Sequence, residues 1–386
     1  MKPVGLVDVS PDVSDSPEAA RYNRIRRWLG MGDTALGIAL LLVLLATGWT
    51  GSLRDIALKA SYHNSYPLAV FFYVFELALL AKLLSLPLDY YGFRLEHRFN
   101  LSNQKLRGWI ADEIKGFFVS LILYTILVEL LYFTIRLNPE IWWLVAWAIF
   151  IALMIFFAQI APVVLFPLFY KFNPLENDEL RERLVRLSER AGTRVRGVYE
   201  WKLSEKSKKA NAALAGLGAT RRIILADTLL QNYTPDEIEA VLAHELGHHV
   251  RKHVFKGIIV QIGLTFLGFF AVDAVLRYAI ERQHMFEQMS DFAALPLLAL
   301  VSTLLSLLLL PLWNAYSRRN EREADLYCCQ AIPSVTPYIS ALNKLCAQNL
   351  GERHPSRLVE VLFHSHPPIS KRIAAAEQFA QKSAAK

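Results

Sequence analysis

The sequence has few of the residues that staple small secreted proteins together. Three cysteines occur among 386 residues, and the neighbours Cys328 and Cys329 would need a strained bond to pair with each other. A disulfide framework is therefore excluded, and we expect Cys328, Cys329 and Cys346 to be small buried apolar residues in a reducing compartment. Internal repeats, low-complexity tracts and long flexible linkers are lacking as well.

Charge is also scarce. Asp, Glu, Lys and Arg make up 20% of the chain, against 54% hydrophobic residues, and the net charge is +7. The basic residues flank apolar runs, and the sequence lacks a basic face interleaved with aromatic residues. We therefore predict that the basic residues contact the headgroups of a lipid bilayer, and we expect no nucleic-acid partner.

Long apolar runs are what the sequence does contain. A helix needs about 20 mostly apolar residues to cross the hydrocarbon core of a bilayer. Runs of this kind cover residues 34–51, 67–88, 116–135, 141–169, 254–280 and 293–316. The first run lacks a small-residue cleavage site and five more runs follow it, so we expect an anchor that is not removed. The runs predict six spanning helices.

Basic residues predict how these spans are oriented. Lys and Arg are dense before the first run and within 94–107, whereas 138–140 has none and 281–291 has a single one. Cytoplasmic loops carry such an excess, so both termini are predicted on the cytoplasmic side, together with 171–253 and 317–386. We expect a multi-pass protein of a bacterial inner membrane, or of the endoplasmic reticulum membrane if the chain is eukaryotic.

Composition divides the chain into five segments. They are a cytoplasmic segment with a short interfacial helix (1–32), four transmembrane helices (33–170), a soluble segment (171–253), two transmembrane helices (254–316) and a second soluble segment (317–386). The interfacial helix is predicted because EAARYNRIRRWLG mixes arginines with Tyr22 and Trp28, which suits the headgroup layer. Pro162 and Pro167 are expected to kink or end the fourth span.

The first soluble segment has local patterns of both helix and strand. An amphipathic helix is predicted at 180–192, strands at 195–203 and 221–227, and a glycine-rich turn at 210–220. Another helix begins at Thr234, because Pro235 follows this N-cap residue and Glu237 can close a capping box. That helix is expected to run through AVLAHELGHHV, residues 240–250.

The HELGH sequence in this helix suggests a zinc site. His244 and His248 are one helical turn apart and project from one face, and Glu245 lies at the edge of that face. In the HExxH pattern two imidazoles bind zinc and the glutamate takes a proton from water, whose pKa the metal lowers to about 7. The pattern also occurs by chance in helices, so a polar helix beside a membrane is the alternative.

A catalytic zinc site needs a third protein ligand. The extended pattern would place a histidine at position 254, where the sequence has Val254. After the sixth run, AYSRRNEREAD offers Glu321 as a carboxylate ligand and Asp325, one turn on, to orient a ligand histidine. Glu323 points away from their shared face, and His253 falls off the ligand face of the HELGH helix. A solvated, charge-rich helix is the alternative for this segment.

Several motifs together resemble the integral-membrane zinc metalloproteases of the CAAX prenyl protease 1 type. They are HELGH, SRRNEREAD, KANAALAG and HSHPPISKR, supported by KFNPLEN and FNLSNQKL. The resemblance implies a mostly α fold, in which a multi-pass helical bundle of about six spans encloses a chamber and carries a gluzincin-like α+β zinc protease domain on the cytoplasmic side. The family has seven spans, so this chain departs from it by lacking the first.

The resemblance also implies roles for individual residues. One Zn²⁺ per chain would be bound by His244, His248 and Glu321. The catalytic residues would be Glu245 as general base, Asp325 to orient a ligand histidine, and His366 with Arg372 to steady the oxyanion. Asn211, in KANAALAG, would hold the substrate backbone beside an edge strand.

These features predict a monomeric zinc metalloendopeptidase that hydrolyses peptide bonds in a peptide or protein substrate. The resemblance suggests cleavage near the C-terminus of prenylated or lipid-associated peptides. Three alternatives stay open: a heat-shock-type membrane quality-control zinc protease, a membrane transporter with an incidental HExxH, and an inactive scaffold. Four ionisable residues within spans fit either an ion pathway or the wall of a hydrated chamber with helix pairing, namely Glu76, Lys82, Glu129 and Asp273.

Overall fold

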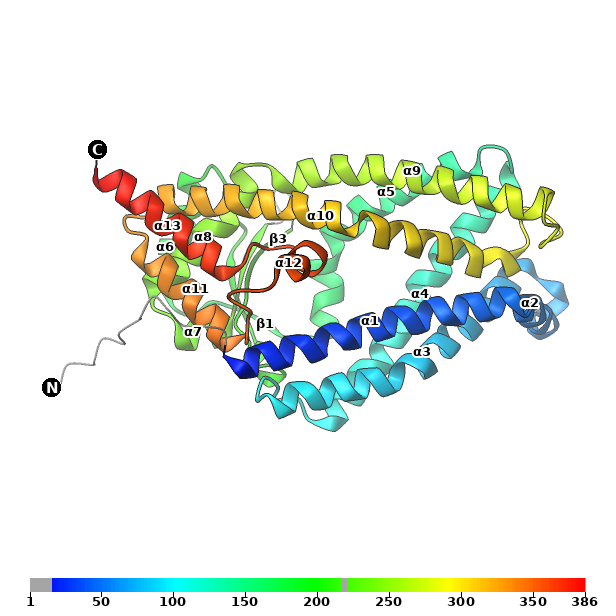
Figure 1. Cartoon of the computed structure of the whole chain (residues 1–386), viewed down its shortest axis with the longest axis horizontal. Helices are drawn as coiled ribbons and strands as arrows, with labels where there is room; N and C mark the ends of the chain where they lie inside the picture. Colours follow the sequence, from blue (N-terminus) through cyan, green and yellow to red (C-terminus); the bar gives the residue numbers. More distant parts are fainter. Residues whose placement is uncertain (1–15, 217–220, 386) are drawn as a thin grey trace.

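The structure, a computed structural model, describes residues 16–216 and 221–385. Long helices run side by side along the molecule, and a compact α+β part is joined to one end of them (Figure 1). We call the long helices the helical bundle: α1 (Pro17–Ala46), α3 (Tyr66–Arg98), α4 (Leu106–Leu137), α5 (Trp142–Ile160), α9 (His253–Glu281) and the first two thirds of α10 (Leu295–Ala331). The short helix α2 (Trp49–Ala60) lies at its far end.

Within the described residues, six helical stretches are long and apolar enough to cross a membrane, as the sequence predicted. They are Pro17–Ala46, Tyr66–Arg98, Leu106–Leu137, Trp142–Leu168, His253–Glu281 and Phe292–Ala331. The second, third, fifth and sixth extend beyond their apolar runs at both ends, because the flanking residues continue the helix past the part that can lie in hydrocarbon. The first begins before its run but ends at Ala46, and the fourth lies within its run. The mostly α fold with about six spans is therefore confirmed.

The first helix differs from the prediction. Residues 17–46 form one helix, so the separate interfacial helix within 1–32 is wrong for its described part, and residues 1–15 lie outside the described residues. Tyr22 is fully buried and donates a hydrogen bond to Glu96, which holds the first turns against the protein and not in the headgroup layer. Gly48, with a φ of 72°, separates this helix from α2.

The fourth span ends irregularly, as its prolines predicted. After α5 come a π-helical turn, η2 (Ala161–Leu165), and a 3₁₀ turn, η3 (Phe166–Leu168). Pro162 and Pro167 lack the N–H that a continuous α-helix would need at these positions. The chain then enters the α+β part, which we call the sheet domain.

The sheet domain contains a four-stranded sheet in the order β1-β2-β4-β3. Its strands are β1 (Phe172–Pro174), β2 (Val198–Trp201), β3 (Ala212–Ala215) and β4 (Arg222–Ala226). The parallel pair β2 and β4 is flanked by antiparallel β1 and β3. Strand β3 occupies Ala212–Ala215 of the segment predicted as a turn, so the prediction is wrong for these residues, and residues 217–220 lie outside the described residues. Small side chains flanked by glycine look like a turn, but here they pair with Ile223 and Ile224 as an edge strand.

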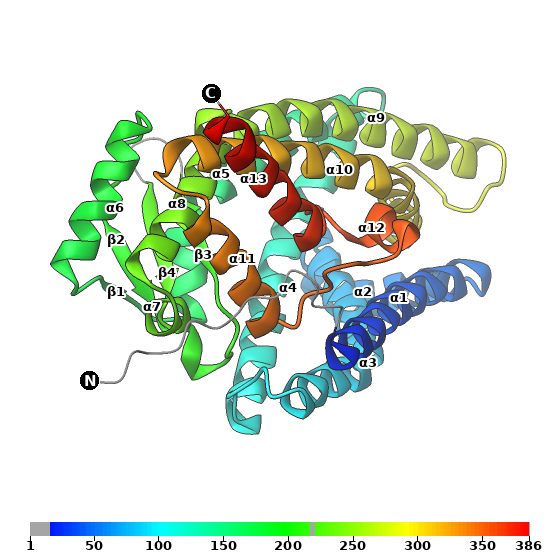
Figure 2. The same ribbon diagram turned by 60° about the vertical axis from the view of Figure 1, so that its left-hand side comes forward.

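Helices cover this sheet and complete the domain. They are α6 (Asp178–Arg190), α7 (Asp227–Asn232), α8 (Pro235–Val250), the end of α10, α11 (Thr336–Gln348), α12 (Arg357–Phe363) and α13 (Ile369–Ala384), with the short turn η4 (Leu203–Glu205). Figure 2 shows α12 and α13 beside the part of α10 that follows the spans. The start of α1 joins the same end of the molecule, since Arg27 pairs with Glu352 at 2.5 Å.

One hydrophobic core unites two distant parts of the chain. Leu184, Leu225 and Leu246 precede the last two spans, while Cys328 and Leu342 follow them, yet all five are buried in the same cluster. Cys328 is fully buried, as predicted for a small apolar residue. The sheet domain is thus a single packed unit, although the chain crosses the bundle twice between its halves.

The bundle, in contrast, leaves space between its helices. A cavity of about 970 Å³ lies among α1, α3, α4 and α10, and Lys82 and Glu113 line part of it. A second cavity of about 600 Å³, lined mainly by apolar residues of α4, α5, α9 and α10, adjoins the first at Val128. Asp273 accepts hydrogen bonds from Trp142 and Arg277. Ionisable residues of the bundle therefore serve both as cavity wall and in helix pairing.

Candidate metal centre

Helix α8 starts at the capping box that the sequence predicted. The Thr234 hydroxyl accepts from the N–H of Glu237, and the Glu237 carboxylate accepts from the N–H of Thr234 at 2.8 Å. Lys344 and Ser340 of α11 also donate to this carboxylate, at 2.7 and 2.6 Å. The start of the helix is therefore fixed to the sheet domain, and its histidines follow three turns later.

Helices α8 and α10 approach each other closely at the glycine of HELGH. A Cβ added at Gly247 would lie 2.9 Å from both the Cα and the carbonyl oxygen of Ala324. Only glycine leaves room for this contact of backbone with backbone. The close approach sets the face of α8 that bears His248 against the turn of α10 that bears Glu321.

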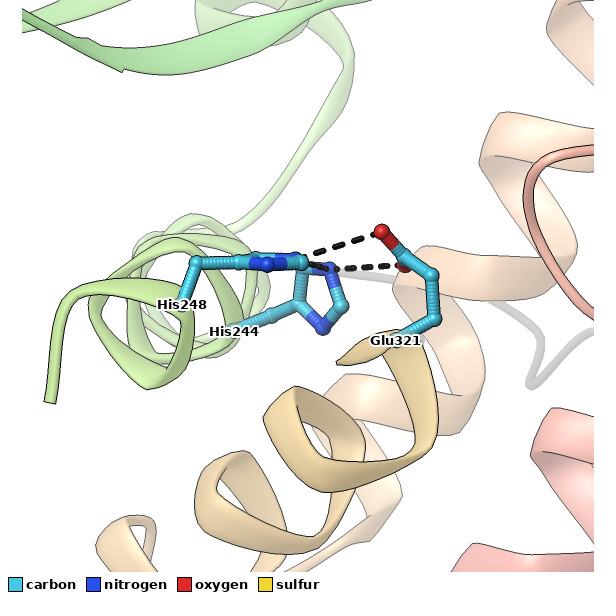
Figure 3. Close-up of side chains that lie close together, drawn as sticks. All are labelled: His244, His248 and Glu321. Carbon is cyan, nitrogen blue, oxygen red and sulfur yellow. Dashed lines mark hydrogen bonds and ion pairs between the residues drawn. The ribbon is translucent and has the colours of Figure 1, made fainter. Parts of the chain in front are cut away.

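Three side chains meet at this contact (Figure 3). The Nε2 atoms of His244 and His248 lie 3.3 Å apart. Glu321 places Oε2 at 3.3 Å from the first and Oε1 at 3.2 Å from the second. Ligands held 2.0–2.1 Å from a tetrahedral zinc are about 3.3 Å from one another, so the three separations are those of a zinc site.

The surroundings of the three groups also favour a cation. Glu321 is 4% exposed, and its Oε2 accepts no hydrogen bond of acceptable geometry from the described residues, although nitrogen atoms lie close to it. Burial alone would lower the pKa of His244, but Asp325 and Glu321 outweigh it and raise this pKa to about 9. A buried set of two imidazoles and a carboxylate fits Zn²⁺, which accepts nitrogen and oxygen ligands.

A dense network lies behind His244. The Nδ1 of this histidine is 2.9 Å from Asp325 Oδ1. Arg372 donates to both oxygens of Asp325, at 2.6 and 2.9 Å, and Tyr338 donates to Oδ1 at 2.5 Å. Asp325 thus lies where it can orient a ligand histidine. Arg372 also contacts His244 and Tyr338, and one of its nitrogens lies 3.9 Å from Glu321 Oε2.

His253 contacts the other ligand histidine, which corrects the prediction that it falls off the ligand face. It is 5% exposed, and its Nδ1 lies 3.1 Å from Nδ1 of His248. Its Nε2 is 3.2 Å from Glu323, the residue predicted to point away from the face shared by Glu321 and Asp325. The chain bends between His248 and His253 at Lys252, which adopts a left-handed conformation. Because lysine rarely adopts this conformation, the sequence did not predict the bend.

The remaining predicted site residues lie in the sheet domain: Glu245 on α8, His366 shortly before α13, and Asn211 directly before β3. Glu245 follows His244 directly, is half-buried, and has no hydrogen bond or ion pair to other described residues. The Nδ1 of His366 lies 2.8 Å from Glu321 Oε2, while its side chain is 61% exposed. Asn211 is exposed and immediately precedes the edge strand β3, where its carbonyl accepts from Ala226.

Comparison with known proteins agrees with this geometry. Residues 174–380 match the model of peptidase family M48, and residues 12–171 match the N-terminal region of CAAX prenyl proteases, described as five membrane helices. The chain belongs to peptidase family M48. This M48 chain is a membrane metalloprotease, and the family membership removes the reading of HELGH as an incidental motif.

Relatives of this M48 protease cover most of its length. The Bacillus subtilis metalloprotease YhfN is 32% identical over 95% of this chain and 86% of its own. A probable CAAX prenyl protease 1 of Schizosaccharomyces pombe is 25% identical over 97% of this chain and 82% of its own. The crystal structure of S. mikatae Ste24p superposes with a TM-score of 0.84 at 25% identity, covering 93% of this chain and 88% of that one.

The number of spans distinguishes this M48 protease from the matched N-terminal model. That model is described as five membrane helices, whereas the described part of residues 12–171 holds four candidate spans. Helix α2, with 12 residues, is too short to cross a bilayer.

The predicted resemblance to the CAAX prenyl protease 1 type is confirmed by these matches.

Proposed function

We propose that this M48 protease is an endopeptidase whose single Zn²⁺ is held by His244, His248 and Glu321. The observation that carries the proposal is that the two Nε2 atoms lie 3.3 Å apart and each lies 3.2 to 3.3 Å from one oxygen of the buried Glu321 carboxylate, whose Oε2 accepts no hydrogen bond of acceptable geometry from the described residues. Zinc bound there supplies a Lewis acid that polarises a carbonyl and makes water more acidic. The chain's own residues supply the remaining steps.

Glu245 is the general base. Its carboxylate takes a proton from the attacking water and returns it to the leaving amine. This role needs a carboxylate at the edge of the centre that has no other hydrogen-bond or ion-pair partner. The exposed His366 lies beside Glu321 and donates to the oxyanion that develops on the carbonyl. We assign Arg372 to the network that positions Asp325 and His244, in place of the oxyanion role that the family resemblance implied.

The substrate binds as an extended peptide. Asn211 and the edge strand β3 offer main-chain hydrogen-bonding groups that an added strand can use. The bundle cavities adjoin each other and are open to apolar groups, which supports a peptide cleaved near its C-terminus and carrying a prenyl or other lipid chain. Peptides matched in sequence, with and without an isoprenyl group, will show whether the lipid is required.

The enzyme works as a monomer with its site on the cytoplasmic side of its membrane. The start of α1, the sheet domain and α13 lie at one end of the bundle (Figure 1). The basic residues in the first turns of α1, and those from the end of α3 to the start of α4, support a cytoplasmic position for that end. A bacterial inner membrane fits this arrangement, as does the endoplasmic reticulum membrane in a eukaryote. Accessibility of engineered cysteines in intact cells tests the orientation.

The decisive experiment replaces the base and leaves the ligands. Glu245→Gln should retain about one zinc per chain by metal analysis and lose about 10²- to 10⁴-fold in peptide hydrolysis. Glu287→Gln, in the exposed loop at the far end of the bundle, is the matched control and should match the wild type. Full activity of Glu245→Gln, or wild-type protein that binds no zinc, would refute the proposal.

A further inference from the structure

The ligand histidine His248 has an outer partner of its own. Its Nε2 faces Glu321 at 3.2 Å, while its Nδ1 faces Nδ1 of His253 at 3.1 Å. The other nitrogen of His253 faces Glu323 at 3.2 Å. These contacts therefore form a chain from His248 on α8, through His253 at the start of α9, to the Glu323 carboxylate on α10.

Proton positions along this line follow from the chemistry of neutral imidazole. When Nε2 of His248 offers its lone pair to zinc, the single proton of that ring is on Nδ1. This N–H can donate only if Nδ1 of His253 has the lone pair, which puts the proton of His253 on Nε2. That second N–H then donates to the Glu323 carboxylate. One assignment satisfies all three groups, and it keeps His248 in the ligating tautomer.

The backbone is bent at the position that makes the contact. In an unbroken helix, a side chain five residues on is rotated by about 140° around the axis and cannot meet its predecessor. Here α8 ends at Val250, and Lys252 adopts the left-handed conformation with a φ of 56° and a ψ of 35°. A residue with a Cβ is strained in this region. The bend returns the ring of His253 to His248.

The two ligand histidines therefore have different supports. His244 meets a carboxylate directly, and Asp325 is in turn held by Arg372 and Tyr338. On its Nδ1 side, His248 meets a carboxylate only through His253. A buried histidine at position 253 could have a purely structural role. However, its Nδ1 faces His248 and its Nε2 faces Glu323, which is the arrangement that leaves Nε2 of His248 free to bind zinc. This order connects His253 to the metal centre.

We propose that His253, backed by Glu323, is a positioning residue that holds His248 in the orientation and tautomer needed to bind zinc. The inference rests on the proposed function, because it assumes that His248 is a ligand. Loss of an outer partner of this kind reduces metal affinity or activity by about 10- to 100-fold.

Three variants of the full-length protein in detergent or liposomes test the proposal. His253→Phe keeps a ring of similar size and removes both nitrogens. His253→Gln restores an acceptor toward His248 and a donor toward Glu323. His249→Phe, four residues earlier and half-buried on the ligand helix α8 itself, is the matched control. The readouts are zinc affinity by competition with a chelator and the visible absorption spectrum of the cobalt-substituted protein, which reports ligand geometry.

We expect His253→Phe to bind zinc 10- to 100-fold more weakly with an altered cobalt spectrum, and His253→Gln to recover most of both. His249→Phe should match the wild type. Wild-type affinity in His253→Phe would overturn the inference, as would a Gln variant no better than Phe. If the Phe variant does not fold, Glu323→Gln decides: a weaker shift in the same direction supports the proposal, and no shift overturns it. Wild-type protein without zinc would instead refute the proposed function.

Discussion

In the sheet domain, residues from both sides of the α9–α10 excursion share one buried core, whereas the bundle keeps cavities of about 970 and 600 Å³ between its helices. Close packing holds side chains in single positions, and space allows a large ligand to enter. The difference separates two tasks. The sheet domain determines the geometry of the metal centre, and the proposed function assigns the cavities of the bundle to the apolar part of the substrate.

The largest effect should come from removing the ligand that α10 supplies. Glu321→Ala deletes one of three zinc ligands while both histidines stay in the sheet-domain core. We expect zinc below one per chain and a fall in hydrolysis of about 10³-fold or more, since zinc contributes several kcal/mol of charge stabilisation. Metal analysis and peptide cleavage measure this. A variant with full zinc content would show that the centre does not span α8 and α10.

The next effect tests the role of Arg372. Arg372→Met leaves Asp325 buried without its ion-pair partner, which destabilises by about 3–5 kcal/mol. If Arg372 positions the network behind His244, zinc affinity and thermal stability should fall together. A variant with unchanged zinc affinity and a reduced kcat alone would instead return Arg372 to the oxyanion role.

A smaller effect is expected where the helices touch. Gly247→Ala forces a methyl group against the Ala324 backbone, and such overpacking costs about 1–3 kcal/mol. Zinc affinity should fall with stability, as measured by unfolding and chelator competition. Gly257→Ala is the matched control, because a Cβ there meets no atom within 4 Å. Equal behaviour of the two variants would contradict a role for the close approach.

The smallest effect should come from the bundle and leave the metal untouched. Val128→Phe adds bulk where the two cavities adjoin. Zinc content should stay at the wild-type level, while kcat/KM for a lipidated peptide falls by about 10-fold, a difference of the size that pocket contacts give. Leu308→Phe, on a side of α10 where the leucine is 72% exposed, is the control. A loss of zinc in Val128→Phe would break the separation of tasks.

Strong local chemistry made some parts of the molecule predictable. Apolar runs gave the six candidate spans, and the capping box at Thr234 gave the start of α8. The pairing of HELGH with Glu321 was predictable because the segment after the sixth apolar run contains a carboxylate that completes a known zinc ligand set. The roles of Glu245, Asn211 and His366 stay predictions, as does the division into five segments.

Other parts depend on contacts that sequence patterns do not encode. Strand β3 has small side chains near glycine and forms because β4 offers it an edge. The first turns of α1 carry arginines that suit headgroups, but Tyr22 finds Glu96 and a buried site instead. His253 was missed because periodicity assumes an unbroken helix, and the bend at Lys252 is a left-handed residue without a glycine.

The order of the ligands along the chain has a consequence for biosynthesis. A chain whose synthesis has reached Glu281, at the end of α9, carries both histidines but not yet Glu321. The carboxylate arrives only after α10 has been made and has returned alongside α9. The nascent protein is therefore without a complete ligand set until α10 has been made, so under the proposed function it cannot cleave other proteins before that stage of its synthesis.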